Sequence, residues 1–226
     1  MSALASVLEQ LTSFATGADA TAELVRAKEE FFAETGEIFD NDRAFEARSA
    51  AFLDHFLFAR PQGNPPRTPA ELFLAQKGEA LSDEARAAAL GLTRTLHGLY
   101  EVVHLDKGTA DVRDVLHGDL LRVTERRHIA GLVKEDLIEA RLIPVGDAYI
   151  FAAGFLCHPR EARTAILREV RRRRARGEPL GRAFVWELSR MEIKVERYRN
   201  IPLSAIYRFD KPSFPAHAPT SERRPS

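Results

Sequence analysis

Apolar residues recur at helical spacing through the first part of the chain. Within residues 2–16 one helical face carries Leu4, Val7, Leu8, Leu11 and Phe14, and Gly17 follows as a stop signal. The same spacing predicts helices over residues 21–35, from an N-cap at Asp40 to just before Pro61, from Thr68 onward, and from an N-cap at Ser82 to about Leu96. At the start of the helix that begins at Thr68, the residues Thr68 and Glu71 predict a capping box around Pro69.

The apolar spacing changes after Gly98. Five short runs rich in branched and aromatic residues, separated by turn sequences, cover residues 99–105, 110–115, 120–125, 137–144 and 148–156. Strands at this spacing predict a small five-stranded antiparallel barrel-like sheet of the SH3-like or OB-like kind.

Two further helices are predicted after the last strand. The first opens at Pro159 and shows an apolar face up to Val170, where an arginine run begins. The second carries an apolar stripe made of Phe184, Leu188, Met191, Val195 and Tyr198. Two heptads are fewer than a persuasive coiled coil needs, so we expect this stripe to pack on the sheet, with Trp186 off the stripe.

The fold class is therefore α+β. The pattern divides the chain into a helical region at 1–97, a barrel-like domain at 98–158, a basic helical extension at 159–211 and a tail at 212–226. Repeated prolines and small polar residues predict disorder for the tail.

The composition, with 45% hydrophobic and 29% charged residues, is typical of an ordinary globular protein. The 226 residues include 33 basic and 33 acidic side chains, with 16 basic against 25 acidic before residue 159 and 17 against 8 from there on. Such asymmetry indicates either a basic segment for an acidic partner or halves that neutralise each other. A single cysteine, no basic residue before Arg26 and no apolar run long enough to span a bilayer together favour the cytoplasm.

Several familiar catalytic signatures are missing. The 13 glycines form no phosphate-binding loop, and neither a nucleophile elbow nor a zinc-protease helix is present, so we name no catalytic residue and no cofactor. Cys157 and His158 adjoin at the end of the last strand, where a metal or thiol site is one hypothesis. The alternative is a buried thiol beside scattered histidines.

Four carboxylates close together in sequence could suggest a paired-acid site: Asp40, Asp42, Glu46 and Asp54. We interpret Asp40 as a helix cap, and we expect the other three on a solvated helix face.

The strongest surface feature is the arginine run, which consists of Arg168, Arg171, Arg172, Arg173, Arg174 and Arg176. With Trp186, these residues are the candidate binding site. The first hypothesis is a non-enzymatic cytosolic binding or regulatory module that acts through protein contacts or self-association. The second is nucleic-acid binding, because arginine contacts phosphate in bidentate fashion. The third is an enzyme or metalloprotein centred on Cys157 and His158.

About half of the chain carries short pieces of a known pattern. These pieces are FLDHFLF at 52–58, TPAELF at 68–73, LYEV at 99–102, VRDVLHG at 112–118, RLIPVG at 141–146 and YIF at 149–151. They resemble a group of uncharacterised bacterial proteins that often end in a cysteine-rich SEC-C zinc motif. The resemblance implies helices followed by a small barrel and supplies no reaction. The C-terminus has no cysteine cluster onto which the zinc ligands could map.

Overall fold

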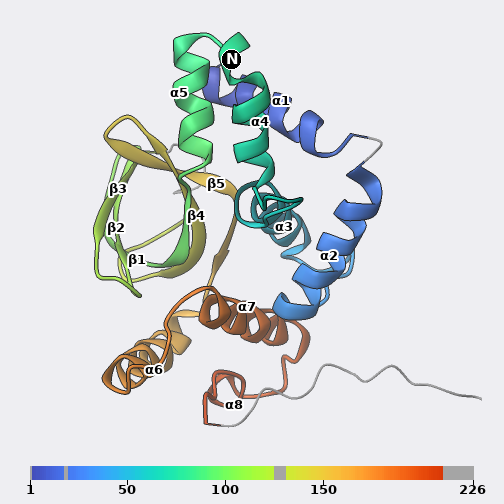
Figure 1. The fold of residues 1–226 in the computed structure, drawn as a ribbon. Helices are drawn as coiled ribbons and strands as arrows, with labels where there is room; N and C mark the ends of the chain where they lie inside the picture. Colours follow the sequence, from blue (N-terminus) through green and yellow to red (C-terminus); the bar gives the residue numbers. More distant parts are fainter. Residues whose placement is uncertain (1, 18–19, 125–130, 211–226) are drawn as a thin grey trace, which may run out of the picture.

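The computed structural model describes residues 2–17, 20–124 and 131–210, so the predicted tail at 212–226 lies outside the described residues. The chain begins with helices and continues into a sheet (Figure 1). The N-terminal helices are α1 (Ala3–Ala15), α2 (Thr21–Thr35), α3 (Phe45–Ala59), α4 (Pro69–Lys77) and α5 (Asp83–Leu92), with a short 3-10 turn, η2 (Gly78–Ala80), after α4.

Local capping fixes most of these helix starts. The side chains of Ser2 and Ser82 accept hydrogen bonds from the backbone three residues on, at 3.3 Å each, and Thr68 forms the predicted capping box with Glu71. The predicted start of α3 at Asp40 is wrong, because the helix begins at Phe45. The end of α5 predicted near Leu96 is also wrong, since Leu96 already pairs with β4 in the sheet.

The sheet contains the five predicted strands: β1 (Leu96–Asp106), β2 (Thr109–Asp114), β3 (Leu120–Thr124), β4 (Leu137–Val145) and β5 (Ala148–Cys157). Their order is β1-β2-β3-β5-β4, and β4 pairs back with β1, which closes the sheet. The prediction of an all-antiparallel sheet is wrong, because β3 and β5 pair in parallel through Val123 and Tyr149. A mixed helix and sheet fold is confirmed, while its SH3-like or OB-like class stays a prediction.

Alternation along β4 explains how the sheet joins the helices. Ile138, Ala140 and Leu142 lie in the interior of the closed sheet with residues of β1 and β2. The intervening side chains face outward. They are nevertheless buried, because helices cover that face, and they include the charged residues Glu139 and Arg141. Two polar side chains are thus enclosed between sheet and helices.

Helix α3 packs closely against β5. A Cβ atom built on Gly154 would lie 2.3 Å from the Ala51 backbone nitrogen, so glycine is required for this approach. The Asp54 side chain, one turn further along α3, accepts a hydrogen bond from the Gly154 N–H at 3.1 Å. This contact fixes the first helical region against the sheet.

The C-terminal elements cover the lower side of the sheet in Figure 1. They are η3 (Arg160–Ala162), α6 (Arg163–Ala175), α7 (Arg182–Arg197) and α8 (Leu203–Ile206). As expected, Phe184, Leu188 and Met191 of α7 are buried in a cluster with Leu99 and Leu137 of the sheet. Within the described ranges, no helix has the length and apolar character needed to cross a bilayer. The division of the chain into four segments stays a prediction.

Candidate functional site

Helix α6 carries the arginine run and rests on the sheet through its apolar side. Ile166 and Val170 are buried in the same cluster as Leu99 and Val115. Because residues four apart share a helix face, these two anchors leave the remaining faces of α6 to the arginines.

Two arginines of the run are paired inside the protein. Arg172 donates from Nε and Nη2 to the two carboxylate oxygens of Glu169, at 2.7 and 2.6 Å. Arg173 donates to the same carboxylate at 2.7 Å and to Glu187 of α7 at 2.7 Å. These contacts, with the hydrogen bond from Arg172 first, lower the pKa of Glu169. Both guanidinium groups therefore hold α6 together and join it to α7.

A third arginine contacts the sheet. Nη2 of Arg174 donates to the carbonyl oxygens of Val115 and Leu116, at 3.1 and 3.0 Å. These carbonyls follow the end of β2, so Arg174 links α6 to that turn. The sequence could not identify this role, because the partners lie about 60 positions away and are backbone atoms.

Four arginines of the run are exposed, namely Arg168, Arg171, Arg174 and Arg176, and of these Arg174 is held by the two carbonyl groups. Arg176 has one ion pair, with its Nη1 at 3.7 Å from Glu178. Within the described part of the chain, the side chains of Arg168 and Arg171 have neither hydrogen bonds nor ion pairs. Arg168 and Arg171 can therefore contact a ligand without breaking an internal hydrogen bond or ion pair, and Arg176 would give up only its 3.7 Å ion pair.

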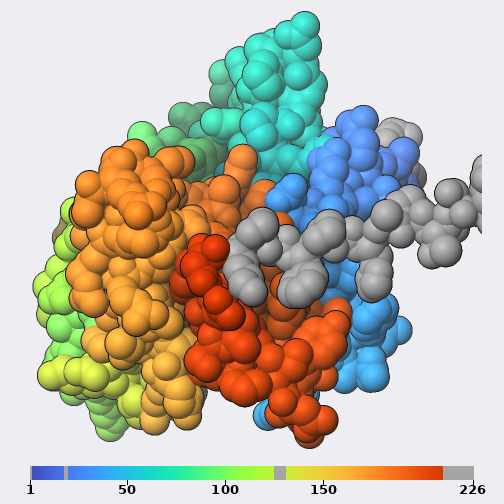
Figure 2. Space-filling view, turned by 90° about the horizontal axis from the view of Figure 1, so that it is seen from below, coloured from blue at the N-terminus to red at the C-terminus, as the bar shows by residue number. Residues whose placement is uncertain are grey.

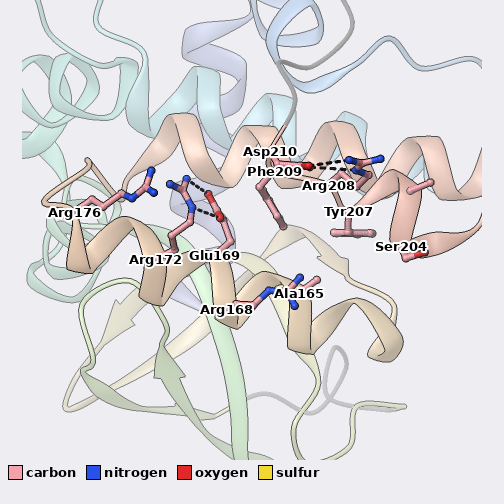
Figure 3. Close-up of a pocket in the computed structure, with 11 residues that line it drawn as sticks. Ala165, Arg168, Glu169, Arg172, Arg176, Ser204, Tyr207, Arg208, Phe209 and Asp210 are labelled. Carbon is pink, nitrogen blue, oxygen red and sulfur yellow. Dashed lines mark hydrogen bonds and ion pairs between the residues drawn. The ribbon is translucent and has the colours of Figure 1, made fainter.

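A groove of about 860 Å³ separates α6 from α8 and the residues that follow it. We call it the α6–α8 groove. Figure 2 shows α6 and α8 on the same face of the molecule, and Figure 3 shows the groove lining. Helix α6 and its C-cap contribute Ala165, Arg168, Glu169, Arg172 and Arg176, and the opposite wall contributes Ser204, Ala205, Tyr207, Arg208, Phe209 and Asp210.

Positive charge predominates in this groove. It is lined by four arginines and two carboxylates, Glu169 and Asp210. Arg208, which sequence reasoning missed, donates to Asp210 at 3.1 and 2.8 Å. Its isolated position in the sequence gave no signal, and only the packing of α8 opposite α6 adds it to the site.

The wall formed by α8 depends on two aromatic side chains. Tyr207 is 3% exposed, and its hydroxyl lies 3.1 Å from Nδ1 of His158. The Phe209 ring lies 6.1 Å from the ring of Phe184 on α7. Since α8 itself is only four residues long, these contacts determine where the wall stands.

Trp186 lies away from the groove. Its ring packs against Phe31 and His55 at centroid distances of 5.8 and 5.2 Å, and the Arg182 guanidinium lies 5.0 Å above it. The ring also lines a small cavity between α3, α7 and the sheet. The partner-contact role of Trp186 stays a prediction.

Polar groups converge on this cavity, which has space for one water molecule at most. Asp54 lies there, so the prediction of a solvated position for this residue is wrong. Desolvation raises the pKa of Asp54 to about 6, against the opposing effects of the Gly154 N–H and Arg141. Desolvation also lowers the pKa of His55 to about 3 and that of Arg141, whose Nε has no partner in the described structure. This enclosed cluster holds α3 on the sheet and offers no room for a substrate.

Cys157 and His158 face opposite ways. His158 is buried against Tyr207, whereas Cys157 is exposed, so the prediction of a buried thiol is wrong. Desolvation by its neighbours, followed by the charges of Asp136 and Glu192, raises the pKa of Cys157 to about 11, which disfavours the nucleophilic thiolate. Among the described residues, no three potential ligands of the His, Cys, Asp or Glu type gather closely enough to hold a metal ion.

Comparison with known proteins gives one match. Residues 21–179 match the model of a family described as a family of unknown function (DUF7986). No curated protein and no solved structure matches the chain. The match spans α2 to the end of α6 and contains the arginine run, whereas the opposite wall of the groove lies beyond it.

Proposed function

The chain belongs to the DUF7986 family, whose function is unknown, and we propose that it is a non-enzymatic binding module that holds an acidic segment of a partner protein in the α6–α8 groove. One observation carries this proposal. The groove is lined by more guanidinium groups than carboxylates, and the exposed Arg168 among them has no partner in the described part of the chain.

The chemistry of the lining supports a peptide ligand. A carboxylate that meets an arginine forms short, charge-assisted hydrogen bonds. Ala165 and Phe209 add apolar surface between the charges, and protein interfaces combine apolar contact with polar groups in this way. An acidic side chain on Arg168 would replace solvent without breaking an internal ion pair.

The nucleic-acid hypothesis is the alternative, and the same arginines argue against it. Arg172, Arg173 and Arg174 are committed to Glu169, Glu187 and backbone carbonyls, which removes half of the run from phosphate binding. Glu169 and Asp210 also line the groove, where they repel a phosphate backbone. A short acidic peptide can place its carboxylates between these charges.

Fluorescence anisotropy with a labelled acidic peptide tests the proposal. The probe would contain glutamate, alanine and leucine, and a lysine version and a labelled single-stranded DNA would be run beside it. We expect the acidic peptide to bind at about 50 mM salt and Arg168→Ala to weaken binding by about fivefold.

The matched control is Arg171→Ala, which removes another exposed arginine from the same helix outside the groove lining. It should change peptide affinity little. DNA binding that both substitutions weaken equally would favour the nucleic-acid alternative, and binding of no acidic probe would overturn the proposal.

A further inference from the structure

The two outer arginines of the α6–α8 groove have a defined separation. Arg168 and Arg176 both line the groove and both have exposed side chains. Arg176 is the C-cap of α6 and follows Arg168 by eight positions, so the helical rise per residue places their backbones about 12 Å apart along the axis. A ligand that meets both must carry two negative charges at a similar distance.

The middle of the groove is electrostatically different. There Arg172 donates to both oxygens of Glu169 and also to Glu178, at 3.3 Å for each of two contacts. Two carboxylates thus share one guanidinium. Arg172 is therefore already neutralised. An acidic group that approached this point would be repelled by both glutamates.

An extended peptide can match this arrangement. Side chains at alternate positions of an extended chain point to the same side. Four positions then cover about 13 Å. Two acidic residues four positions apart would therefore reach Arg168 and Arg176 together, while the residue midway between them would face the neutralised Arg172.

We infer that the α6–α8 groove selects an extended segment with two acidic side chains four positions apart and a neutral side chain midway between them. This inference rests on the proposed function and adds the spacing of charges that the partner must carry. Phe209 on the opposite wall lies near Glu169 (Figure 3), so a small apolar side chain suits the central position.

Three labelled peptides of equal length test the spacing, with the full chain and anisotropy as the readout. The first has glutamate at its first and fifth positions, the second has the same composition with both glutamates adjacent, and the third adds a glutamate midway. The first should bind about three- to fivefold more tightly than the second, as expected for one additional ion pair. It should also bind more tightly than the third, despite the lower charge.

The preference should disappear in Arg176→Ala and persist in Arg171→Ala. If the first two peptides bind equally but both are weakened by Arg168→Ala, the spacing is wrong and the proposed function stands. If the third peptide binds most tightly, total charge governs binding and the spacing is overturned. If none of the three binds at low salt, the spacing and the proposed function both fail.

Discussion

Arg48 of α3 and Glu192 of α7 form a buried ion pair, with Nη2 of the arginine 2.7 Å from Oε2 of the glutamate. The arginine is 2% exposed and also donates to the backbone carbonyls of Ser189 and Thr35. One guanidinium thus joins α2, α3 and α7. The ion pair connects residues of α3 and α7 that lie 144 positions apart in the sequence. This contact holds the N-terminal helices to the C-terminal elements.

Removal of this guanidinium should destabilise the whole chain. We expect Arg48→Met to lower the free energy of unfolding by about 3–5 kcal/mol, because it leaves the Glu192 carboxylate and two carbonyls without their donor. Urea denaturation followed by circular dichroism measures the change. Arg171→Ala is the control and should stay within about 0.5 kcal/mol of the wild type. Equal stability of Arg48→Met and the control would show that the pair contributes nothing.

Asp54 should make stability depend on pH in a defined direction. Burial raises its folded-state pKa to about 6, above the ordinary value of 3.8, so the folded state binds the proton more tightly than the unfolded state. The stabilisation from this group is complete below about pH 4 and is lost as the pH rises through about 6. Asp54→Asn removes the titration.

The comparison of interest is the difference in unfolding free energy between wild type and Asp54→Asn across that pH range. Relative to the variant, the wild type should lose stability from about pH 4 to about pH 6, by an amount on the order of 3 kcal/mol. A pH-independent difference would contradict the burial of an ionisable Asp54. Carboxyl carbon NMR gives its pKa directly as a second measurement.

Gly154 tests the approach of α3 to β5. In Gly154→Ala, the new Cβ would lie 2.3 Å from the backbone nitrogen and 2.5 Å from the Cα of Ala51, so the helix or the strand must move. We expect a loss of about 3 kcal/mol or more, since the clash is with backbone rather than with a flexible side chain. Gly181→Ala is the matched control, because no atom lies within 4 Å of its added Cβ. Similar unfolding midpoints for the two variants would refute the close packing.

The sequence contained the local features of this fold and lacked the long-range ones. Ser2, Thr68 and Ser82 cap helices through atoms three residues away, so their roles could be predicted from neighbouring letters. The burial of Asp54 could not, because it depends on Gly154 lying 100 positions further on.

Long-range contacts also give the six arginines of the run different roles, which the sequence could not show. The six arginines look equivalent in sequence. In the structure, however, Arg173 donates to Glu187, and Arg174 donates to a carbonyl of the turn after β2. The opposite wall of the groove depends on the packing of Tyr207 and Phe209 in the apolar cluster that contains Phe184 of α7. No local sequence pattern encodes this packing. The candidate site was thus predicted on one side only.

Tyr207 should control the order of α8. Its buried ring and its contact with His158 fix a helix of only four residues, which is too short to persist alone. Tyr207→Ala should therefore speed hydrogen exchange at Ile206 and residue 207, whose amides bond to Pro202 and Leu203. Tyr207→Phe keeps the ring and should have a smaller effect. Unchanged exchange in both variants would mean that other contacts hold the wall, and Arg171→Ala provides the baseline.

Arg168 and Arg172 should separate binding from stability although they lie one turn apart on α6. The Arg168 side chain has no partner in the described structure, so Arg168→Ala should leave the urea midpoint of unfolding unchanged and should weaken binding of the acidic peptide. Arg172→Ala removes two hydrogen bonds from Glu169, which is 5% exposed and would be left with Arg173. It should lower the midpoint, because a buried carboxylate loses its bidentate partner. The double substitution Arg172→Ala with Glu169→Ala should recover part of that loss, since the buried carboxylate is then removed as well and Arg173 keeps Glu187. A midpoint lowered equally by Arg168→Ala and Arg172→Ala would show that both arginines are structural, and peptide affinity would then no longer report on the groove alone.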